Sequence, residues 1–110
     1  MSDHLSNERK QELCRLMASN LPTLRTKANI SQGELADRLG FSRQTISAVE
    51  NGKREMQWNV FSAVVPLFSK NIEIYQLMVV MGIINDDVEK ILSLPSKEND
   101  SLHETDGDWI

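Results

Sequence analysis

The chain has few of the residues on which several classes of small protein depend. Cys14 is the only cysteine among 110 residues, which excludes an intramolecular disulfide and a cysteine-based metal site. The two histidines, His4 and His103, stand near opposite ends, and there is no glycine-rich phosphate loop. No apolar run approaches the roughly 18 residues that a membrane helix needs. We therefore expect neither an enzyme nor a membrane protein, and no metal or cofactor.

The overall composition is that of one small folded domain. Hydrophobic residues make up 40% of the chain and charged residues 25%, close to the averages for globular proteins. A chain of 110 residues has room for a single core. Residues 1–12 lack the charged-then-apolar pattern of a signal peptide, and a single cysteine suits a reducing compartment. These features favour a cytoplasmic protein.

Charge is divided unevenly along the chain. The net charge is -4, but residues 9–54 hold nine Lys and Arg against four Asp and Glu, whereas residues 55–110 hold three against ten. The basic part is therefore a candidate surface for phosphate groups, and the acidic part is expected to face away from DNA or to bind something else.

Apolar residues from residue 7 onward repeat at the spacing of one helix face. They predict a helix over about residues 7–27, with an apolar face of Leu13, Leu16, Met17, Leu21 and Leu24. Pro22 falls inside this range and lacks the amide hydrogen that a helix interior needs. Two alternatives stay open: Pro22 kinks one helix, or Asn20 caps a new helix there.

Capping signals predict two short helices next. Ser31 and Glu34 have the spacing of a capping box, which starts a helix at about Gln32. Gly40 suits the left-handed conformation that ends a helix. Ser42 then caps a helix over about residues 43–50.

The two short helices are expected to cross at a large angle around the glycine turn. The inward side chains are then Leu35, Ala36, Leu39, Phe41, Ile46 and Val49. The outward face of the second helix is left with Arg43, Gln44, Ser47 and Ala48. These side chains suit contacts with base edges.

This stretch resembles the helix-turn-helix of the Cro and phage-repressor family. The family pattern is met by Gln32, Leu35-Ala36, Gly40, Ile46 and Glu50-Asn51-Gly52. The resemblance covers about residues 20–68 and implies a compact helical DNA-binding domain, usually dimeric, whose second motif helix enters the major groove. The proline that the family commonly has after Gly52 is missing.

The resemblance implies roles for individual residues. Base readout falls on Ser42, Arg43, Gln44, Ser47 and Ala48. Arg43 suits guanine and Gln44 suits adenine, and the methyl group of Ala48 suits that of thymine. The resemblance places Asn51 and Lys53 near the DNA backbone. The helix start at Gln32 suits an anion by its own chemistry, Arg54 rests on its charge alone, and Thr45 is a further candidate for a phosphate or sugar. The family often joins an arginine of the helix before the motif to the glutamate at the end of the second motif helix, which here implies an ion pair between Arg25 and Glu50.

The C-terminal half predicts further helices. One helix is expected to begin near Trp58 and to have Pro66 in its last turn, and another is expected to begin at Asp86-Asp87. Residues 72–84 are more apolar than a surface helix needs, so they either form a dimer interface or complete a monomer core. Residues 95–110 are polar and acidic and are expected to be disordered, although Trp109-Ile110 are candidates for docking on a groove.

Together these patterns predict an all-α, five- to six-helix, lambda-repressor-like domain with an acidic C-terminal tail. We expect a DNA-binding domain at 1–70 with its motif at 32–51, a dimerisation segment at 71–94 and the tail at 95–110. The predicted function is sequence-specific binding of double-stranded DNA by a homodimeric transcriptional repressor. The alternative is a protein-binding module, such as an antitoxin or adaptor, that binds its partner through residues 72–110.

Overall fold

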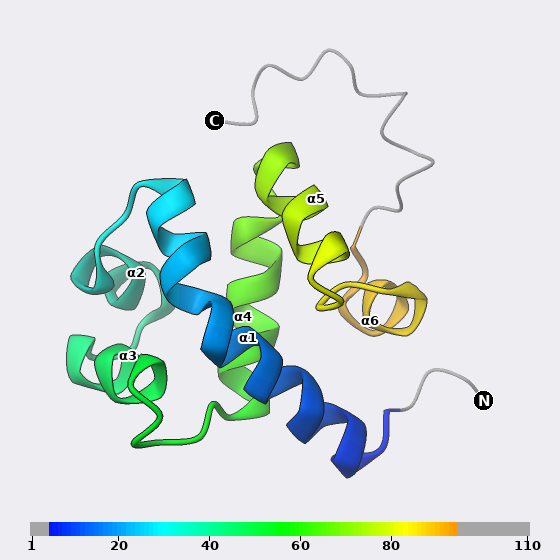
Figure 1. The fold of residues 1–110 in the computed structure, drawn as a ribbon, viewed down its shortest axis with the longest axis horizontal. Coiled ribbons are helices and arrows are strands. Elements are labelled where there is room, and N and C mark those ends of the chain that lie inside the picture. Colours follow the sequence, from blue (N-terminus) through cyan, green and yellow to red (C-terminus); the bar gives the residue numbers. More distant parts are fainter. Residues whose placement is uncertain (1–4, 95–110) are drawn as a thin grey trace.

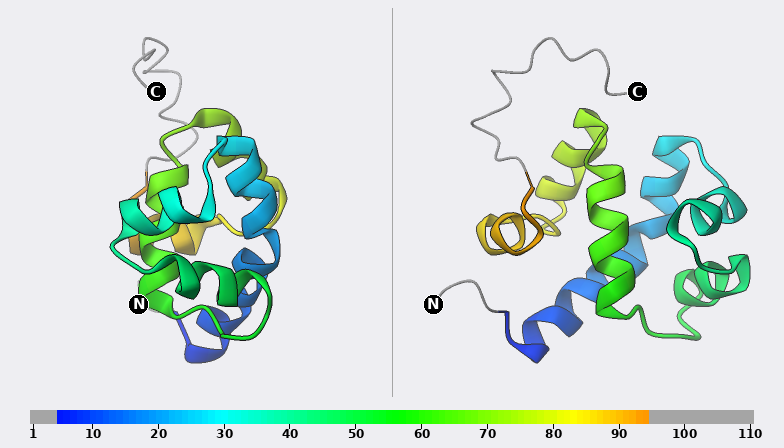
Figure 2. Two further views of the ribbon diagram at one scale, coloured as in Figure 1. Left: turned by 90° about the vertical axis from the view of Figure 1, so that its left-hand side faces the viewer. Right: turned by 180° about the vertical axis from the view of Figure 1, so that it is seen from behind.

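The computed structural model describes residues 5–94, which form an all-helical domain (Figures 1 and 2). The helices are α1 (Asn7–Ala28), α2 (Gln32–Leu39), α3 (Arg43–Glu50), α4 (Trp58–Phe68), α5 (Ile72–Val80) and α6 (Asp86–Leu92). The prediction of an all-α fold with five to six helices is confirmed. The predictions for residues 95–110, Trp109 and Ile110 included, lie outside the described residues.

α1 is a single helix that continues through Pro22. The alternative in which Asn20 caps a new helix is wrong, because the Asn20 amide nitrogen instead donates to the Leu16 carbonyl one turn earlier, at 2.9 Å. Pro22 cannot donate to the carbonyl of Ala18, four residues before it. The buried face of the helix, which includes Leu21 and Leu24 on either side of Pro22, holds α1 together across this missing bond.

α2 and α3 begin and end where their caps predict. Ser31 and Glu34 form the capping box, with the Ser31 amide donating to Glu34 Oε1 at 2.8 Å and the Glu34 amide donating to Ser31 Oγ at 3.0 Å. Gly40 ends α2 at a φ of 78°. Ser42 Oγ then accepts from the Thr45 amide at 3.1 Å and starts α3. Only two residues, Phe41 and Ser42, separate the left-handed glycine from α3, so the two helices pack closely on each other.

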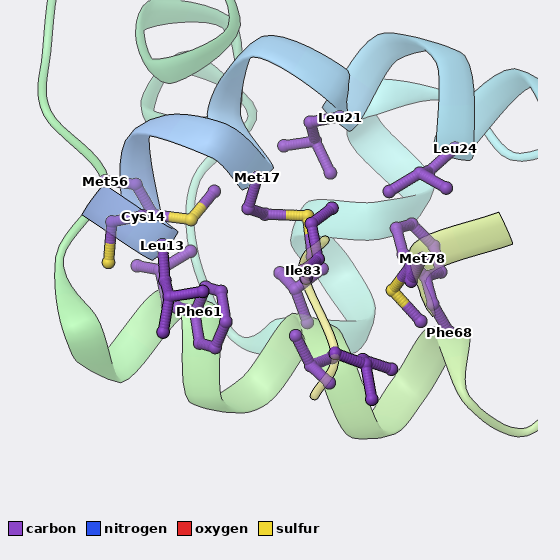
Figure 3. Close-up of a cluster of buried hydrophobic side chains, with 14 of the residues drawn as sticks. Leu13, Cys14, Met17, Leu21, Leu24, Met56, Phe61, Phe68, Met78 and Ile83 are labelled. Carbon is purple, nitrogen blue, oxygen red and sulfur yellow. The ribbon is translucent and has the colours of Figure 1, made fainter. Parts of the chain in front are cut away.

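The core lies between α1 and α4 and is closed by the C-terminal segment. Figure 3 shows Leu13, Met17 and Leu21 of α1 pointing toward α4, with Ile83 between the two helices. The buried side chains of the C-terminal segment are Ile74, Tyr75, Met78, Ile83, Ile84 and Val88. Much of the apolar segment 72–84 therefore completes the core of one chain, the second of the two alternatives. Val80 is the exception, with 82% of its surface exposed.

α4 starts at Trp58, although the proline typical of the preceding loop is missing. The Trp58 ring is half-buried and stacks on Phe61 with ring centroids 4.7 Å apart. The Lys10 ammonium lies 5.4 Å from the centroid of the same ring. The contact with Lys10 joins the beginning of α4 to α1, and the stack with Phe61 lies within α4. Pro66 lies inside the last turn of α4, which ends at Phe68.

We expect Gly40→Ala to lower the free energy of unfolding by about 1 kcal/mol, because a Cβ disfavours the left-handed backbone. Gly33→Ala is the matched control. A Cβ at Gly33, inside α2, would meet Arg43 Cδ and Ser31 Oγ at the ordinary distances of 3.8 and 3.9 Å. This control should gain about 0.5–1 kcal/mol from helix propensity. Urea unfolding measures both changes, and a Gly40→Ala chain as stable as the parent would contradict a left-handed helix end.

The thiol of Cys14 should be protected in the folded chain. Burial first, and the negative charge of Glu55 second, raise the pKa of Cys14 from 9.0 to about 11. At pH 8 the native thiol should therefore react with iodoacetamide about 100-fold more slowly than in concentrated urea.

The same shift has a pH dependence of defined sign. The native state holds the thiol proton more tightly than the unfolded state, so this contribution to stability is present below the ordinary pKa of 9.0 and is lost as pH rises toward about 11. Unfolding curves across this range should show the decline, and Cys14→Ala should remove it. A decline that persists unchanged in the variant would assign it to another group.

Candidate nucleic-acid interface

One face of α3 presents polar side chains to solvent while the other is fixed in the core. Ile46 and Val49 are buried, and Arg43 and Gln44 are exposed. Ser47 and Ala48, which follow Arg43 and Gln44 by four residues, are half-buried on the same outward face. The reading residues predicted inside α3 therefore share one surface, and Ser42 lies exposed at its N-terminal end.

Arg43 leaves α3 next to the first turn of α2. Its Cδ atom lies 3.8 Å from the position that a Cβ on Gly33 would occupy. The start of α2, where the amides of Gln32 and Gly33 precede the capped amide of Glu34, is thus close to the start of the outward face. Amides at a helix N-terminus suit phosphate oxygens, so one side of the domain combines groups for base edges with groups for backbone.

The carboxylate of Glu50 joins three helices behind this face. Arg25 of α1 donates from Nε to Glu50 Oε2 at 2.8 Å and from Nη2 to Oε1 at 3.1 Å. Its Nη1 donates to the Ile30 carbonyl at 3.1 Å, before the start of α2. The side chains of Arg25 and Glu50 are only 17% and 4% exposed. The hydrogen bond with Glu50 raises the pKa of Arg25, against the opposing effect of burial, so Arg25 stays charged.

Gln32 also belongs to this cluster, and the sequence did not predict its contact with Glu50. Its Nε2 donates to Glu50 Oε1 at 2.8 Å. An amide nitrogen carries two hydrogens, so this bond leaves one for the phosphate contact predicted from the sequence. The two residues are 18 positions apart, and no local pattern pairs them.

The residues after α3 lie on the solvent side. Asn51, Lys53 and Arg54 are all exposed. Asn51 Nδ2 is 3.5 Å from Ser47 Oγ, and Arg54 Nη1 donates to Thr45 Oγ1 at 3.3 Å. The structure therefore brings four of the predicted contact residues into two pairs along α3. The basic side chains of Lys53 and Arg54 add positive charge beside the outward face.

Residues 5–94 contain neither a cluster of metal-ligating side chains nor a membrane-spanning helix. No group of three or more His, Cys, Asp and Glu side chains comes together there as a metal site would require. None of the helices in this range combines the length and the apolar character that a bilayer crossing demands. His4 and His103 lie outside the described residues.

Comparison with protein families identifies the motif. Residues 23–55 match the helix-turn-helix family, which supports a motif of the Cro and phage-repressor type, as found in DNA-binding transcriptional regulators. The match covers less than a third of the chain, from the second half of α1 to the loop before α4. Comparison with curated proteins and with solved structures gives no match.

The Glu50 cluster should be measurable as a coupling energy. Replacing Arg25 or Glu50 alone by Met leaves the other charge without its partner and should cost about 2–3 kcal/mol of unfolding free energy. The double variant should cost little more than either single one, which gives a coupling of about 2 kcal/mol.

The control is the Arg9–Glu12 pair, 3.2 Å apart with side chains 32% and 64% exposed. The same replacements there should show a coupling below about 0.5 kcal/mol. Equal coupling in the two pairs would mean that burial does not strengthen the Glu50 cluster.

Proposed function

We propose that the chain binds double-stranded DNA sequence-specifically, as a small transcriptional regulator that places α3 in the major groove. One observation carries the proposal: a helix-turn-helix of the Cro and phage-repressor type presents Arg43 and Gln44, both exposed, on the outward face of α3. The major groove admits a helix, and its base edges differ in their pattern of donors and acceptors.

Each residue of the outward face then has a definite partner. Arg43 donates two hydrogen bonds to O6 and N7 of a guanine, and Gln44 pairs with N6 and N7 of an adenine. The methyl group of Ala48 contacts the methyl group of a thymine. The hydroxyls of Ser42 and Ser47 can bond to donors or to acceptors on the base edges. Each bidentate pair discriminates against the wrong base by about 1–3 kcal/mol.

Phosphate contacts hold α3 in register without reading sequence. We assign them to the amides at the start of α2 and to the side chains of Gln32, Thr45, Asn51, Lys53 and Arg54. Because the cations among them displace counterions from DNA, binding should weaken steeply as salt rises.

We further propose that two copies of the chain bind one operator and repress by occluding a promoter. A two-fold dimer doubles the base contacts and implies half-sites about one helical turn apart. Residues 71–94 offer a surface for pairing, beside the DNA-binding part at 1–70. Leu77 and Met81 are half-buried and share one helix face with Val80, which is 82% exposed. Pairing through this face would cover them.

Selection from a random DNA pool tests the proposal. At one fixed salt concentration, the wild-type chain should enrich a palindrome. Arg43→Ala should lose the preference for one guanine in each half-site and bind the original sequence about 10-fold or more weakly. Gln44→Ala should lose the preference for an adenine at a different position.

Lys90→Ala is the matched control, since it removes an exposed positive charge on α6, outside the motif. It should leave the enriched sequence unchanged. Enrichment of a single half-site without a palindrome would contradict the dimer. Failure to enrich any sequence at low salt would overturn the DNA-binding function and favour a protein-binding module that uses residues 72–110.

A further inference from the structure

A chain of hydrogen bonds connects the loop after α3 to the start of α3. Arg54 Nη1 donates to Thr45 Oγ1 at 3.3 Å, and Thr45 Oγ1 lies 3.0 Å from Ser42 Oγ. Ser42 Oγ also accepts from the Thr45 backbone amide at 3.1 Å. Arg54 is thus held by a residue nine positions earlier in the sequence.

The backbone after α3 explains how Arg54 reaches Thr45. Gly52 takes a φ of 77°, which turns the chain back at the end of the helix. The amides of Lys53 and Arg54 then both donate to the Ala48 carbonyl, at 2.9 and 3.2 Å. Arg54 therefore starts beside Ala48, one turn from Thr45, and its side chain extends along α3 toward the N-terminal end.

Chemistry fixes the direction of the bond between Arg54 and Thr45. A guanidinium only donates, so Thr45 Oγ1 must accept from Arg54. Between the Thr45 and Ser42 hydroxyls either oxygen can be the donor, and Ser42 Oγ also accepts from the Thr45 amide. One of the five guanidinium N–H groups of Arg54 is used in this way, and the others remain for an anion outside the domain.

Thr45 stands at the edge of the outward face of α3. At 100° per residue, it lies between half-buried Ala48 and buried Val49 on the helix circumference. A side chain held there stays beside the reading residues without covering them. The guanidinium of Arg54 is consequently held at the edge of the outward face.

We infer that Thr45 is a positioning residue whose hydroxyl holds the Arg54 guanidinium at the edge of α3, ready to contact a DNA phosphate. The inference rests on the proposed function and deepens it. It gives Thr45 a role through Arg54, beyond the phosphate contact proposed above. It also gives Arg54, which the sequence supports by charge alone, a defined place in the interface.

Positioning matters because a free arginine side chain has many rotamers. Immobilising such a side chain on binding costs about 0.5–1.5 kcal/mol, and a bond made before binding removes part of that cost. A hydroxyl is needed for the bond, and valine has the shape of threonine without it. Thr45→Val should therefore weaken DNA binding about 3- to 10-fold, whereas Thr45→Ser should restore most of the affinity.

The experiment measures DNA affinity for the full chain across a series of salt concentrations, using the sequence that the wild-type chain selects. The variants are Thr45→Val, Thr45→Ser, Arg54→Ala and the double variant Thr45→Val with Arg54→Ala. Thr26→Val is the matched control, because Thr26 is an exposed threonine on α1. Urea unfolding of each variant shows that the fold is retained.

Arg54→Ala should reduce the slope of log affinity against log salt by about one phosphate contact. Thr45→Val should move the slope in the same direction and add little to Arg54→Ala in the double variant. A merely structural threonine would leave the slope unchanged and its effect would add to that of Arg54→Ala. Thr45→Val binding with wild-type affinity, or additive losses, would overturn the inference.

A measurement without DNA separates this inference from the proposed function. Relaxation of the Arg54 Nε–H in ¹⁵N-labelled protein should show an ordered side chain in the wild type and in Thr45→Ser, and a mobile one in Thr45→Val. Equal mobility in all three overturns the positioning role alone. A wild-type chain that selects no DNA overturns the proposed function, and with it the DNA contact of Arg54, whatever the relaxation data show.

Discussion

The geometry of this domain depends on the carboxylate of Glu50. A carboxylate that is 4% exposed loses most of its water, and this loss costs several kcal/mol unless donors replace it. Here the replacements come from Arg25 on α1 and Gln32 on α2. If the end of α3 moved away from the start of α2 or the last turns of α1, the buried charge of Glu50 would lose its donors. The orientation of the outward face of α3 follows from this constraint.

The apolar core and the polar cluster around Glu50 hold different parts of the domain in place. Figures 1 and 2 show α2 and α3 at one end of the molecule and α5 and α6 at the other, with α1 and α4 between them. α1 spans 22 residues and contributes buried side chains along most of its length. Hydrophobic packing holds α1 and α4 together and buries Ile46 and Val49 of α3. The directional bonds to Glu50 add a second constraint on the orientation of α3.

Features that depend on neighbouring residues could be predicted from the sequence. The capping box at Ser31, the left-handed Gly40 and the cap at Ser42 each involve residues within a few positions of one another, and all three are present. Pro22 was harder, because local chemistry permits both a break and a continuous helix, and packing of α1 decides between them. The role of residues 72–84 was open for the same reason, since an apolar sequence does not say which surface covers it.

The polar contacts across long stretches of sequence could not be predicted from residue chemistry. The Arg25–Glu50 pair was predicted from a family resemblance. Neither residue chemistry nor the resemblance predicted the bonds from Gln32 to Glu50 and from Arg54 to Thr45. Many donors in such a sequence suit each acceptor, and only the backbone path selects among them. The missing proline after Gly52 made that path less certain, although the two amides on the Ala48 carbonyl determine it.

These two missed contacts have the same form. In each, a residue of α3 accepts from a donor that lies before or after it in the chain, and the donor keeps further hydrogens for a ligand. Gln32 is held at the start of α2 and Arg54 at the edge of α3. A donor fixed in this way loses less conformational entropy when it meets a phosphate than one that is free in solvent. α3 would then contribute to recognition twice, through its own outward side chains and by ordering the donors on either side of it.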